Sequence, residues 1–239
     1  MKRISLIVPC LNEEEAIPAF KQEIDRVFKE CLEGYAPELI FVDDGSTDRS
    51  LEMIKKMAEH SPEVKFISFS RNFGKEAAIY AGLEAATGDY AAVMDVDLQD
   101  PPSLLPDMLK AIEKEGYDCA GTRRVTRQGE PLLRSFFARV FYKTIHQISD
   151  TRIVDGARDY KLMTRPVLEA LLSLKEYNRF SKGLYEWVGF RTKWFEYENV
   201  ERVAGETKWS FFKLFLYSIE GIVAFSTAPL ALASIMGVL

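Results

Sequence analysis

Cysteine is scarce in this chain of 239 residues, and its three cysteines lie far apart in the sequence, at Cys10, Cys31 and Cys119. This number and spacing exclude a disulfide framework and a cysteine-based zinc site. No signal peptide is recognisable, because Met1 and Lys2 lead directly into a strand-like segment. We therefore expect the folded domain to work in the reducing cytosol.

Basic residues are not in excess either. The chain has 31 lysines and arginines against 36 aspartates and glutamates, which gives a net charge of −5. A protein that binds nucleic acid through a basic surface has the opposite imbalance. The composition therefore predicts no nucleic-acid partner.

Two phosphate-binding signatures are also missing. No G-x-G-x-x-G follows the first apolar segment, and no P-loop Gly-Lys-Ser/Thr occurs anywhere in the chain. The nearest approach, Gly74-Lys75-Glu76, lacks both the upstream glycine and the hydroxyl. Dinucleotide-dependent oxidoreductases and P-loop hydrolases are therefore poor interpretations of this sequence.

The first half of the chain alternates strand-like runs with amphipathic stretches. The apolar runs occupy residues 4–8, 39–42, 64–69, 90–94 and 117–121. Between them, apolar residues recur at the helical spacings of three and four. This order predicts an α/β fold with a mostly parallel sheet covered by helices on both faces. Ligands of such sheets bind beyond the carboxyl ends of the strands, so we expect the functional residues there.

Oxygen-bearing side chains follow the fourth predicted strand at alternate positions. Asp95, Asp97 and Gln99 would share one face of an extended segment. Two carboxylates and an amide oxygen form a hard ligand set that suits Mg²⁺ or Mn²⁺, completed by substrate phosphates and water. An aspartate-rich turn without metal is the alternative, but the place at a strand end favours a ligand site.

Two further carboxylates, Asp43 and Asp44, end the second predicted strand. Carboxylates can accept hydrogen bonds from the N–H groups of a nucleobase and from ribose hydroxyls. The sequence therefore predicts a nucleotide that is bound by carboxylates and whose diphosphate is held by a metal. Alternatively, Asp44 together with Gly45 and Ser46 forms only a turn and a helix cap.

The second half of the chain has an uneven charge distribution. Residues 121–143 contain six basic residues against the single acidic residue Glu130, and they overlap a helix predicted at about 131–149. A second amphipathic stretch, residues 208–225, is rich in tryptophan and phenylalanine. Basic and aromatic residues on amphipathic helices suit a membrane interface. The alternatives are helices packed on the sheet and, for the basic stretch, a solvated helix face.

The C-terminal residues 221–239 include no charged side chain. A membrane-spanning helix needs about 20 apolar residues, and the run from residue 229 supplies about half of one. These patterns predict a main domain over residues 1–205, a juxtamembrane amphipathic helix over 206–228 and the start of a truncated transmembrane segment over 229–239. A hydrophobic helix that packs into the core is the alternative for the last segment.

Short motifs recur in a fixed order along the chain. In the first half they are Val8-Pro9-x-x-Asn12-Glu13-Glu14, Val42-Asp43-Asp44-Gly45-Ser46-x-Asp48, Arg71-Asn72-x-Gly74-Lys75 and Asp95-x-Asp97-x-Gln99-Asp100-Pro101-Pro102. Together they resemble glycosyltransferase family 2. In the second half, motifs similar to the polyprenyl-phosphate glycosyltransferases are Ala157-Arg158-Asp159-Tyr160-Lys161-Leu162-Met163, Asn178-Arg179-Phe180-x-Lys182-Gly183-Leu184, Trp187-Val188-Gly189-Phe190, Arg202-x-x-Gly205-Glu206-Thr207-Lys208 and Phe225-Ser226-x-x-Pro229-Leu230. One departure is Tyr160-Lys161, where the family commonly has Phe-Arg.

The resemblance implies a GT-A fold and an inverting, metal-dependent transfer of a hexose from a nucleotide sugar to a polyprenyl phosphate. Its bacterial members imply UDP-glucose or UDP-N-acetylglucosamine as donor and undecaprenyl phosphate as acceptor, at the cytoplasmic face of the cell membrane. Three alternatives stay open. They are a GDP-mannose-dependent polyprenyl-phosphate mannosyltransferase, a family 2 transferase that acts on polysaccharide or glycoprotein, and a non-catalytic scaffold that binds nucleotide sugars or membrane. Family members also form tetramers, so a dimer or tetramer is an alternative use of the helix at 131–149.

The resemblance also implies roles for individual residues. Asp159 aligns with the proposed catalytic base, and Asp97 acts with it through the metal, which is held by Asp95, Asp97 and Gln99. The residues implied for the nucleotide are Pro9, Asn12, Glu13, Asp43, Asp44, Arg71, Lys75, Asp95, Arg202 and Lys208. Those implied for the acceptor phosphate are Arg123, Arg134 and Arg139. As an alternative, Lys208 and Arg202 pair with the nearby Glu206 and Glu201.

Overall fold

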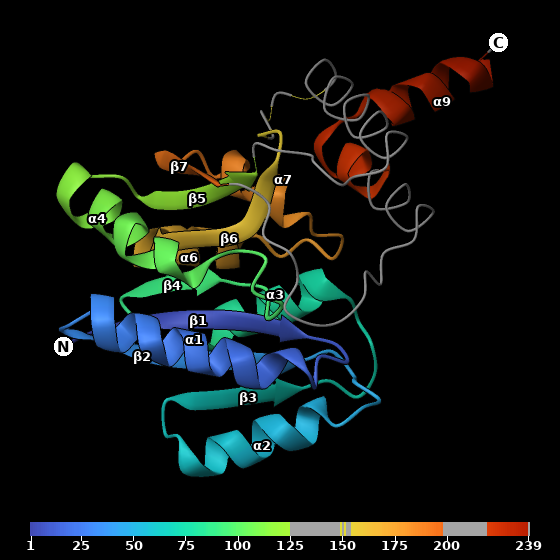
Figure 1. Cartoon of the computed structure of the whole chain (residues 1–239). Helices are drawn as coiled ribbons and strands as arrows, with labels where there is room; N and C mark the ends of the chain where they lie inside the picture. The colour runs from blue at the N-terminus through green and yellow to red at the C-terminus, as the bar shows by residue number, and fades with distance from the viewer. Residues whose placement is uncertain (125–148, 150, 152–153, 198–218, 239) are drawn as a thin grey trace.

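A seven-stranded sheet with helices on both faces forms the core of the molecule (Figure 1). The computed structural model describes residues 1–124, 149, 151, 154–197 and 219–238. The strands are β1 (Lys2–Cys10), β2 (Tyr35–Asp43), β3 (Val64–Ser68), β4 (Tyr90–Val93), β5 (Cys119–Arg124), β6 (Ala157–Thr164) and β7 (Thr192–Tyr197). The helices are α1 (Ala16–Cys31), α2 (Ser50–His60), α3 (Lys75–Ala85), the 3-10 helix η1 (Pro102–Leu104), α4 (Leu105–Glu115), α6 (Arg165–Ser173), α7 (Ser181–Trp187) and α9 (Ala228–Val238).

The strand order is β3-β2-β1-β4-β6-β5-β7, and only β6 runs against its neighbours. The predicted mostly parallel α/β sheet is therefore confirmed. The expectation that the segment at 117–121 simply continues the parallel series is wrong in one respect, since β6 lies between β4 and β5. The sequence pattern does not predict β6, because charged residues interrupt its apolar positions at Arg158, Asp159 and Lys161.

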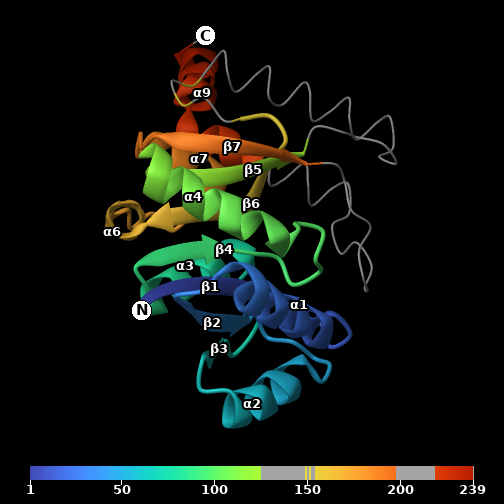
Figure 2. The same cartoon turned by 60° about the vertical axis from the view of Figure 1, so that its left-hand side comes forward.

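Two apolar layers hold the helices to the sheet. Helices α1, α2 and α4 pack on one face and α3, α6 and α7 on the other (Figure 2). Strand β1 shows why the sheet must be covered twice. Its residues Ile4, Leu6 and Val8 enter the first layer, Ile7 enters the second, and all four are fully buried. Such near-continuous apolar runs are typical of parallel strands in doubly covered sheets.

The strand directions bring several chain segments to the side of the sheet at which the parallel strands have their C-terminal ends. We call this side the strand-end edge. The parallel strands β1 to β4 end there, while the antiparallel β6 begins there, with Val93 of β4 beside Lys161 of β6. Asp95, just after β4, and Asp159, near the start of β6, therefore meet at the same edge. This edge is where ligands of open α/β sheets bind.

The C-terminal segment extends beyond the β7 side of the sheet (Figures 1 and 2). Residues 219–225 are helical, and the ring of Phe225 lies 6.3 Å from that of Phe180 and 6.4 Å from that of Trp187. In α9, Leu230 is 71% exposed and Met236 is 69% exposed, so this helix does not pack into the core of the described part of the chain.

Within the described part of the chain, none of the helices combines the length and apolar character that a membrane crossing requires. The start of a transmembrane segment at 229–239 therefore stays a prediction. All but the last residue of the helix predicted at 131–149, and most of the helix predicted at 206–228, lie outside the described residues. The division of the chain at residues 205 and 228 also stays a prediction.

Candidate active site

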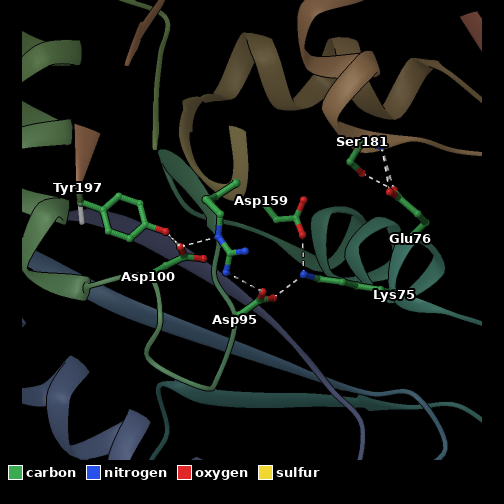
Figure 3. A network of polar contacts seen from close by, with 8 residues as sticks. Lys75, Glu76, Asp95, Asp100, Asp159, Ser181 and Tyr197 are labelled. Atoms are coloured by element: carbon green, nitrogen blue, oxygen red, sulfur yellow. Dashed lines mark hydrogen bonds and ion pairs between the residues drawn. The ribbon is translucent and has the colours of Figure 1, made fainter. Parts of the chain in front are cut away.

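One lysine joins two carboxylates at the strand-end edge. The Nζ atom of Lys75, the first residue of α3, lies 2.6 Å from Asp95 Oδ1 and 2.5 Å from Asp159 Oδ2 (Figure 3). The side chains of Asp95 and Asp159 are only 22% and 15% exposed. The predicted metal ligand Asp95 and the predicted base Asp159 are thus a single ammonium group apart.

The charges in this cluster hold each group in its ionised form. Burial alone would raise the pKa of Asp159, but the charges of Lys75 and Lys182 outweigh it and hold that pKa well below its usual value. Burial would likewise lower the pKa of Lys75, but Asp159 and Asp95 raise it above its usual value. Asp159 is therefore an ionised carboxylate, and it is a weak proton acceptor as long as Lys75 is bound to it.

A second network reaches Asp95 from the other face of the sheet. The Arg158 Nε donates to Asp100 Oδ1 at 3.0 Å, and its Nη2 lies 4.0 Å from Asp95 Oδ2. The Tyr197 hydroxyl donates to the same Asp100 oxygen (Figure 3). Alternate residues of a strand point to opposite faces, so Arg158 and Asp159 project to either side of β6. Asp95 lies between the two networks.

The predicted metal motif forms a tight loop between β4 and η1. The backbone N–H of Gln99 donates to Asp97 Oδ1 at 3.1 Å, and Asp97 is 6% exposed. Leu98, between them, has a φ of 57°, which is an unfavourable left-handed conformation for a leucine. Strain of this kind persists only where surrounding contacts impose it, and it concentrates at functional sites.

The oxygen donors of this loop fit a hard divalent cation. Among the residues that the structure describes, no three His, Cys, Asp or Glu side chains gather closely enough to hold an ion alone. In the predicted metal site, Asp95 and Asp97 would supply two carboxylates and Gln99 an amide oxygen. Mg²⁺ sites are commonly built in this way, from one or two carboxylates together with water and substrate phosphates. The residues present thus fit a Mg²⁺ or Mn²⁺ ion that arrives with a diphosphate.

The two aspartates after β2 are both buried but have different contacts. Asp44 accepts hydrogen bonds from the backbone N–H groups of Phe73 at 2.7 Å and Gly74 at 3.0 Å. Burial raises the pKa of Asp44 despite these bonds. Asp43 accepts a hydrogen bond from the Ser46 N–H at 3.3 Å. Asp44 thus lies in a turn, as the alternative interpretation predicts. It also anchors the loop that leads into α3 and Lys75, and so it helps to shape the site.

The loop after β1 is tied to the loop after β2. The backbone of Asn12, at a φ of 52°, donates to Ser46 Oγ at 2.9 Å, while Asn12 Oδ1 accepts from the Thr47 N–H at 2.7 Å. The Glu13 N–H donates to Ser50 Oγ at 2.7 Å. Pro9 lies beside Val42 in the sheet. The structure therefore brings the predicted nucleotide residues of both loops together at one strand-end edge.

The predicted nucleotide residue Arg71 lies on the loop that follows β3. Its guanidinium stacks on the ring of Phe73, 3.9 Å from the ring centre, and donates to the Asn72 carbonyl at 2.8 Å. A side chain on Gly45 would meet the Arg71 backbone carbonyl carbon at 2.5 Å. Close packing of these two loops thus fixes the place of Arg71 beside the Asp43–Asp44 turn.

Only one of the predicted acceptor-phosphate residues is described. Arg123, at the end of β5, pairs with Glu196 of β7 through its Nη2. The other predicted cations, Arg134, Arg139, Arg202 and Lys208, lie outside the described residues.

Sequence reasoning assigned no role to several residues that the structure brings into the cluster. Arg158 reaches Asp95 and Asp100, and the charge of Lys182 acts on Asp159. Glu76, next to Lys75, accepts from the Ser181 N–H at 3.1 Å and holds the start of α7 there. Arg158 and Lys182 lie within the family-like motifs, which was the available signal, but the motifs alone name no partner, and Glu76 lies just outside them.

Comparisons with known proteins show the family of the chain. Residues 5–172 match the family described as Glycosyl transferase family 2. A Bacillus subtilis (strain 168) protein named glycosyltransferase CsbB is 44% identical over 235 residues, which cover 98% of this chain and 70% of that protein. The prophage bactoprenol glucosyl transferase homolog of Escherichia coli (strain K12) is 42% identical over 235 residues, which cover 98% of this chain and 76% of the homolog.

The fold is also that of a solved structure, the glucosyl-3-phosphoglycerate synthase from Mycobacterium tuberculosis in complex with Mn²⁺ and uridine-diphosphate-glucose. The TM-score is 0.56 at 20% sequence identity, with 92% of this chain and 77% of that chain covered. At this identity the likeness shows a GT-A-like α/β fold and nothing finer. Together with the family match, it leads to one conclusion: the chain belongs to glycosyltransferase family 2 and is a glycosyltransferase.

Proposed function

We propose that this glycosyltransferase moves glucose, or N-acetylglucosamine, from a UDP-sugar to a polyprenyl phosphate, with inversion at the anomeric carbon. Relatives such as the bactoprenol glucosyl transferase homolog support this acceptor class and a bacterial membrane setting. The observation that carries the proposal is the contact of Lys75 with both Asp95 and Asp159. It puts the carboxylate expected on the donor side next to the one expected on the acceptor side.

The reaction requires an oxygen of the lipid phosphate to attack the anomeric carbon. The bond from that carbon to the diphosphate breaks, and its electron pair leaves with UDP. A phosphate monoester has a second pKa of about 6, so at neutral pH the nucleophile is already largely dianionic. It needs positioning more than deprotonation. In this proposal Asp159 orients the acceptor, and it takes a residual proton only when Lys75 has moved away from it, because Lys75 otherwise holds its pKa well below the usual value.

The surrounding cations make this role possible for Asp159. A carboxylate close to an anionic phosphate would repel it, but Lys75 at 2.5 Å and the nearby charge of Lys182 offset that repulsion. Arg123, Arg134 and Arg139 are proposed to add cations on the acceptor side. Asp159 can then hold the acceptor in place without driving it away.

On the donor side, a Mg²⁺ or Mn²⁺ ion would neutralise the negative charge that develops on the leaving diphosphate. Asp95, Asp97 and Gln99 would hold it. The residues proposed to bind the nucleotide or its diphosphate are Pro9, Asn12, Glu13, Asp43, Asp44, Arg71, Lys75, Asp95, Arg202 and Lys208. Asp43, Arg71 and Asn12 come from three loops that meet at the strand-end edge, which supports a common nucleotide pocket.

The proposal places the enzyme at the cytoplasmic face of a bacterial membrane. Exposed apolar side chains along residues 219–236 support contact with lipid. They include Ile219 at 41%, Val223 at 59%, Leu230 at 71%, Ile235 at 60% and Met236 at 69% exposure. Apolar residues that cluster on a surface in this way mark interaction sites.

Calorimetric titration with UDP and GDP, each with and without Mn²⁺, tests the donor site directly. We expect UDP to bind in a Mn²⁺-dependent manner, and Asp97→Asn to weaken that binding by at least about tenfold, because loss of groups around a metal commonly costs that much affinity. Asp107→Asn is the matched control, because Asp107 is an exposed aspartate of α4. A preference for GDP would replace glucose by mannose in the proposal.

Transfer of radiolabelled glucose from UDP-glucose to polyprenyl phosphate in detergent then tests the acceptor. Labelled lipid that carries acid-labile glucose is the expected product. Folded protein that binds neither UDP nor GDP would overturn the catalytic proposal. The protein could instead bind UDP and transfer glucose to a polysaccharide acceptor but not to polyprenyl phosphate. That result would overturn the proposed acceptor class.

A further inference from the structure

We infer that Arg158 is a positioning residue that orients Asp95 and the loop of residues 95–100 through a buried link to Asp100 and Tyr197. This inference rests on the proposed function, because Asp95 is expected to hold the metal of the donor. Among the described residues, Arg158 donates no hydrogen bond to the loops after β1, β2 and β3 or to the acceptor-side carboxylate Asp159. Its contacts instead connect both ends of the 95–100 loop.

Asp100 is the centre of this link. It is 1% exposed, and its Oδ1 accepts hydrogen bonds from both Arg158 Nε, at 3.0 Å, and the Tyr197 hydroxyl. Its Oδ2 is buried and has no hydrogen-bond partner among the described residues. A carboxylate in this environment is costly unless a charge compensates it. Arg158 supplies that charge, so the position of Asp100 depends on Arg158.

The geometry connects this buried pair to the donor side. The same guanidinium that binds Asp100 through Nε places Nη2 4.0 Å from Asp95 Oδ2. Lys75 binds the other carboxylate oxygen of Asp95, Oδ1, at 2.6 Å. Asp95 is thus held between two cations that come from opposite faces of the sheet (Figure 3). A planar guanidinium held by a fixed partner can set the orientation of a second carboxylate, which a flexible lysine does less well.

Tyr197 determines how firmly the guanidinium is held. It is the last residue of β7 and lies 9% exposed beside Asp100. Its hydroxyl shares Asp100 Oδ1 with Arg158, so it limits the positions that the carboxylate can adopt. The link therefore runs from β7 through Asp100 and Arg158 to Asp95, and it fixes a loop that contains the strained residue Leu98.

Tyr197→Phe and Tyr185→Phe form a matched pair of variants that tests the link. Each removes one hydroxyl from a buried tyrosine, but the Tyr185 hydroxyl has no hydrogen-bond partner among the described residues and lies on the other face of the sheet. In the unliganded protein, we expect Tyr197→Phe to accelerate amide hydrogen exchange in residues 95–100 by about tenfold, because a hydrogen bond to a charged group is lost. Tyr185→Phe should leave the exchange rate of these residues unchanged.

Titration with UDP and Mn²⁺ gives the second readout. We expect Tyr197→Phe and Arg158→Gln to weaken Mn²⁺-dependent UDP binding by about tenfold. Arg158→Lys, which keeps the charge, should restore part of the loss. In turnover, the loss should fall on KM for the donor more than on kcat. A purely structural role would lower the thermal midpoint of unfolding and leave the binding of the folded fraction unchanged.

Three outcomes separate this inference from the proposed function. Unchanged amide exchange and unchanged UDP binding in Tyr197→Phe and Arg158→Lys would overturn the inference. In that case, binding of UDP by the wild-type protein would still support the proposed function. A wild-type protein that binds no UDP would overturn the proposed function, and the exchange rates of the unliganded variants would still decide whether the loop is held as inferred. A lower midpoint with unchanged binding would also overturn the positioning role.

Discussion

Lys75 and Asp159 are 84 positions apart in the chain, yet Lys75 Nζ lies 2.5 Å from Asp159 Oδ2. The two residues come from the start of α3 and from the antiparallel strand β6, which the sheet topology brings to one edge. Because Lys75 also binds Asp95, changes at this lysine should affect both sides of the site.

Removal of the Lys75 charge should change the pH dependence of turnover. The pKa of Asp159 lies well below its usual value in the wild type, since Lys75 and Lys182 outweigh the effect of burial. Lys75→Gln should therefore raise this pKa, so that protonation of Asp159 adds a fall in kcat/KM at the acid end of the profile, beyond the one that the acceptor phosphate, with its pKa of about 6, causes in the wild type. Initial rates of glucose transfer between pH 4 and 8 measure this added fall.

Two further variants calibrate that effect. Lys182→Gln should change the acid end of the profile less, because Lys182 acts on Asp159 by charge and Lys75 also donates a hydrogen bond. Lys56→Gln, at an exposed α2 pair with Glu52, should not change it. An acid end that stays unchanged in Lys75→Gln would show that Asp159 ionisation does not control turnover.

Asp159→Asn tests the acceptor-side role. The amide is nearly the same size but cannot take a proton or attract cations, so we expect kcat to fall at least about a hundredfold. UDP binding with Mn²⁺ should change by less than about threefold, since the same Lys75 still faces Asp95. Unchanged turnover in this variant, measured beside its UDP affinity, would eliminate Asp159 from catalysis.

Glu38 is expected to contribute stability that depends on pH. Its buried side chain accepts hydrogen bonds from the Thr87 N–H at 2.9 Å and from Lys65 Nζ at 2.6 Å, and also from the Ser5 hydroxyl. Burial alone would raise the pKa of Glu38, but these bonds lower it to about 2. Glu38→Gln should therefore lower the free energy of unfolding by about 2–3 kcal/mol at pH 7.

The sign of the pH effect follows from the lowered pKa. The stabilisation by Glu38 is fully present above the ordinary glutamate pKa of 4.5 and is lost as the pH falls towards about 2. Urea unfolding at pH 7 and pH 3 should therefore show a smaller difference between wild type and Glu38→Gln at the lower pH. Glu52→Gln, on the exposed face of α2, is the control. A difference that grows on acidification would contradict the prediction.

Gly45→Ala tests the close packing of the two nucleotide-side loops. Gly45 has a φ of 74°, and a Cβ there would lie 2.5 Å from the Arg71 carbonyl carbon and 2.7 Å from the Asn72 nitrogen. Because backbone atoms cannot yield easily, we expect a loss of about 2–4 kcal/mol in the free energy of unfolding and weaker UDP binding.

Gly116→Ala separates backbone strain from a steric clash of the added methyl group. Gly116 has a φ of 73° but nothing within 4 Å of its Cβ position, so this variant should lose only about 1 kcal/mol. Thermal unfolding of both variants measures the difference. Equal losses would mean that the contact with Arg71 and Asn72 adds nothing to the strain at Gly45.

Local sequence pattern was sufficient for the first half of the fold. The apolar runs at residues 4–8, 39–42 and 90–94 predict parallel strands, and the structure forms them as β1, β2 and β4. Since ligands of such sheets bind at the strand ends, the pattern also placed Asp43, Asp95 and Asp97 at the candidate site. The motifs then identified the family, which the comparisons confirmed.

The tertiary structure decided how these residues are paired. Strand β6 could not be recognised because Arg158, Asp159 and Lys161 break its apolar pattern, and its insertion between β4 and β5 is what brings Asp159 to Asp95. Likewise, the link from Tyr197 to Asp100 spans 97 positions. Strand order depends on which apolar faces pack together across the whole domain, and the spacing of residues along one segment does not predict it. The sequence by itself therefore determined the chemistry at the edge of the sheet, and only the folded chain determined which charge faces which.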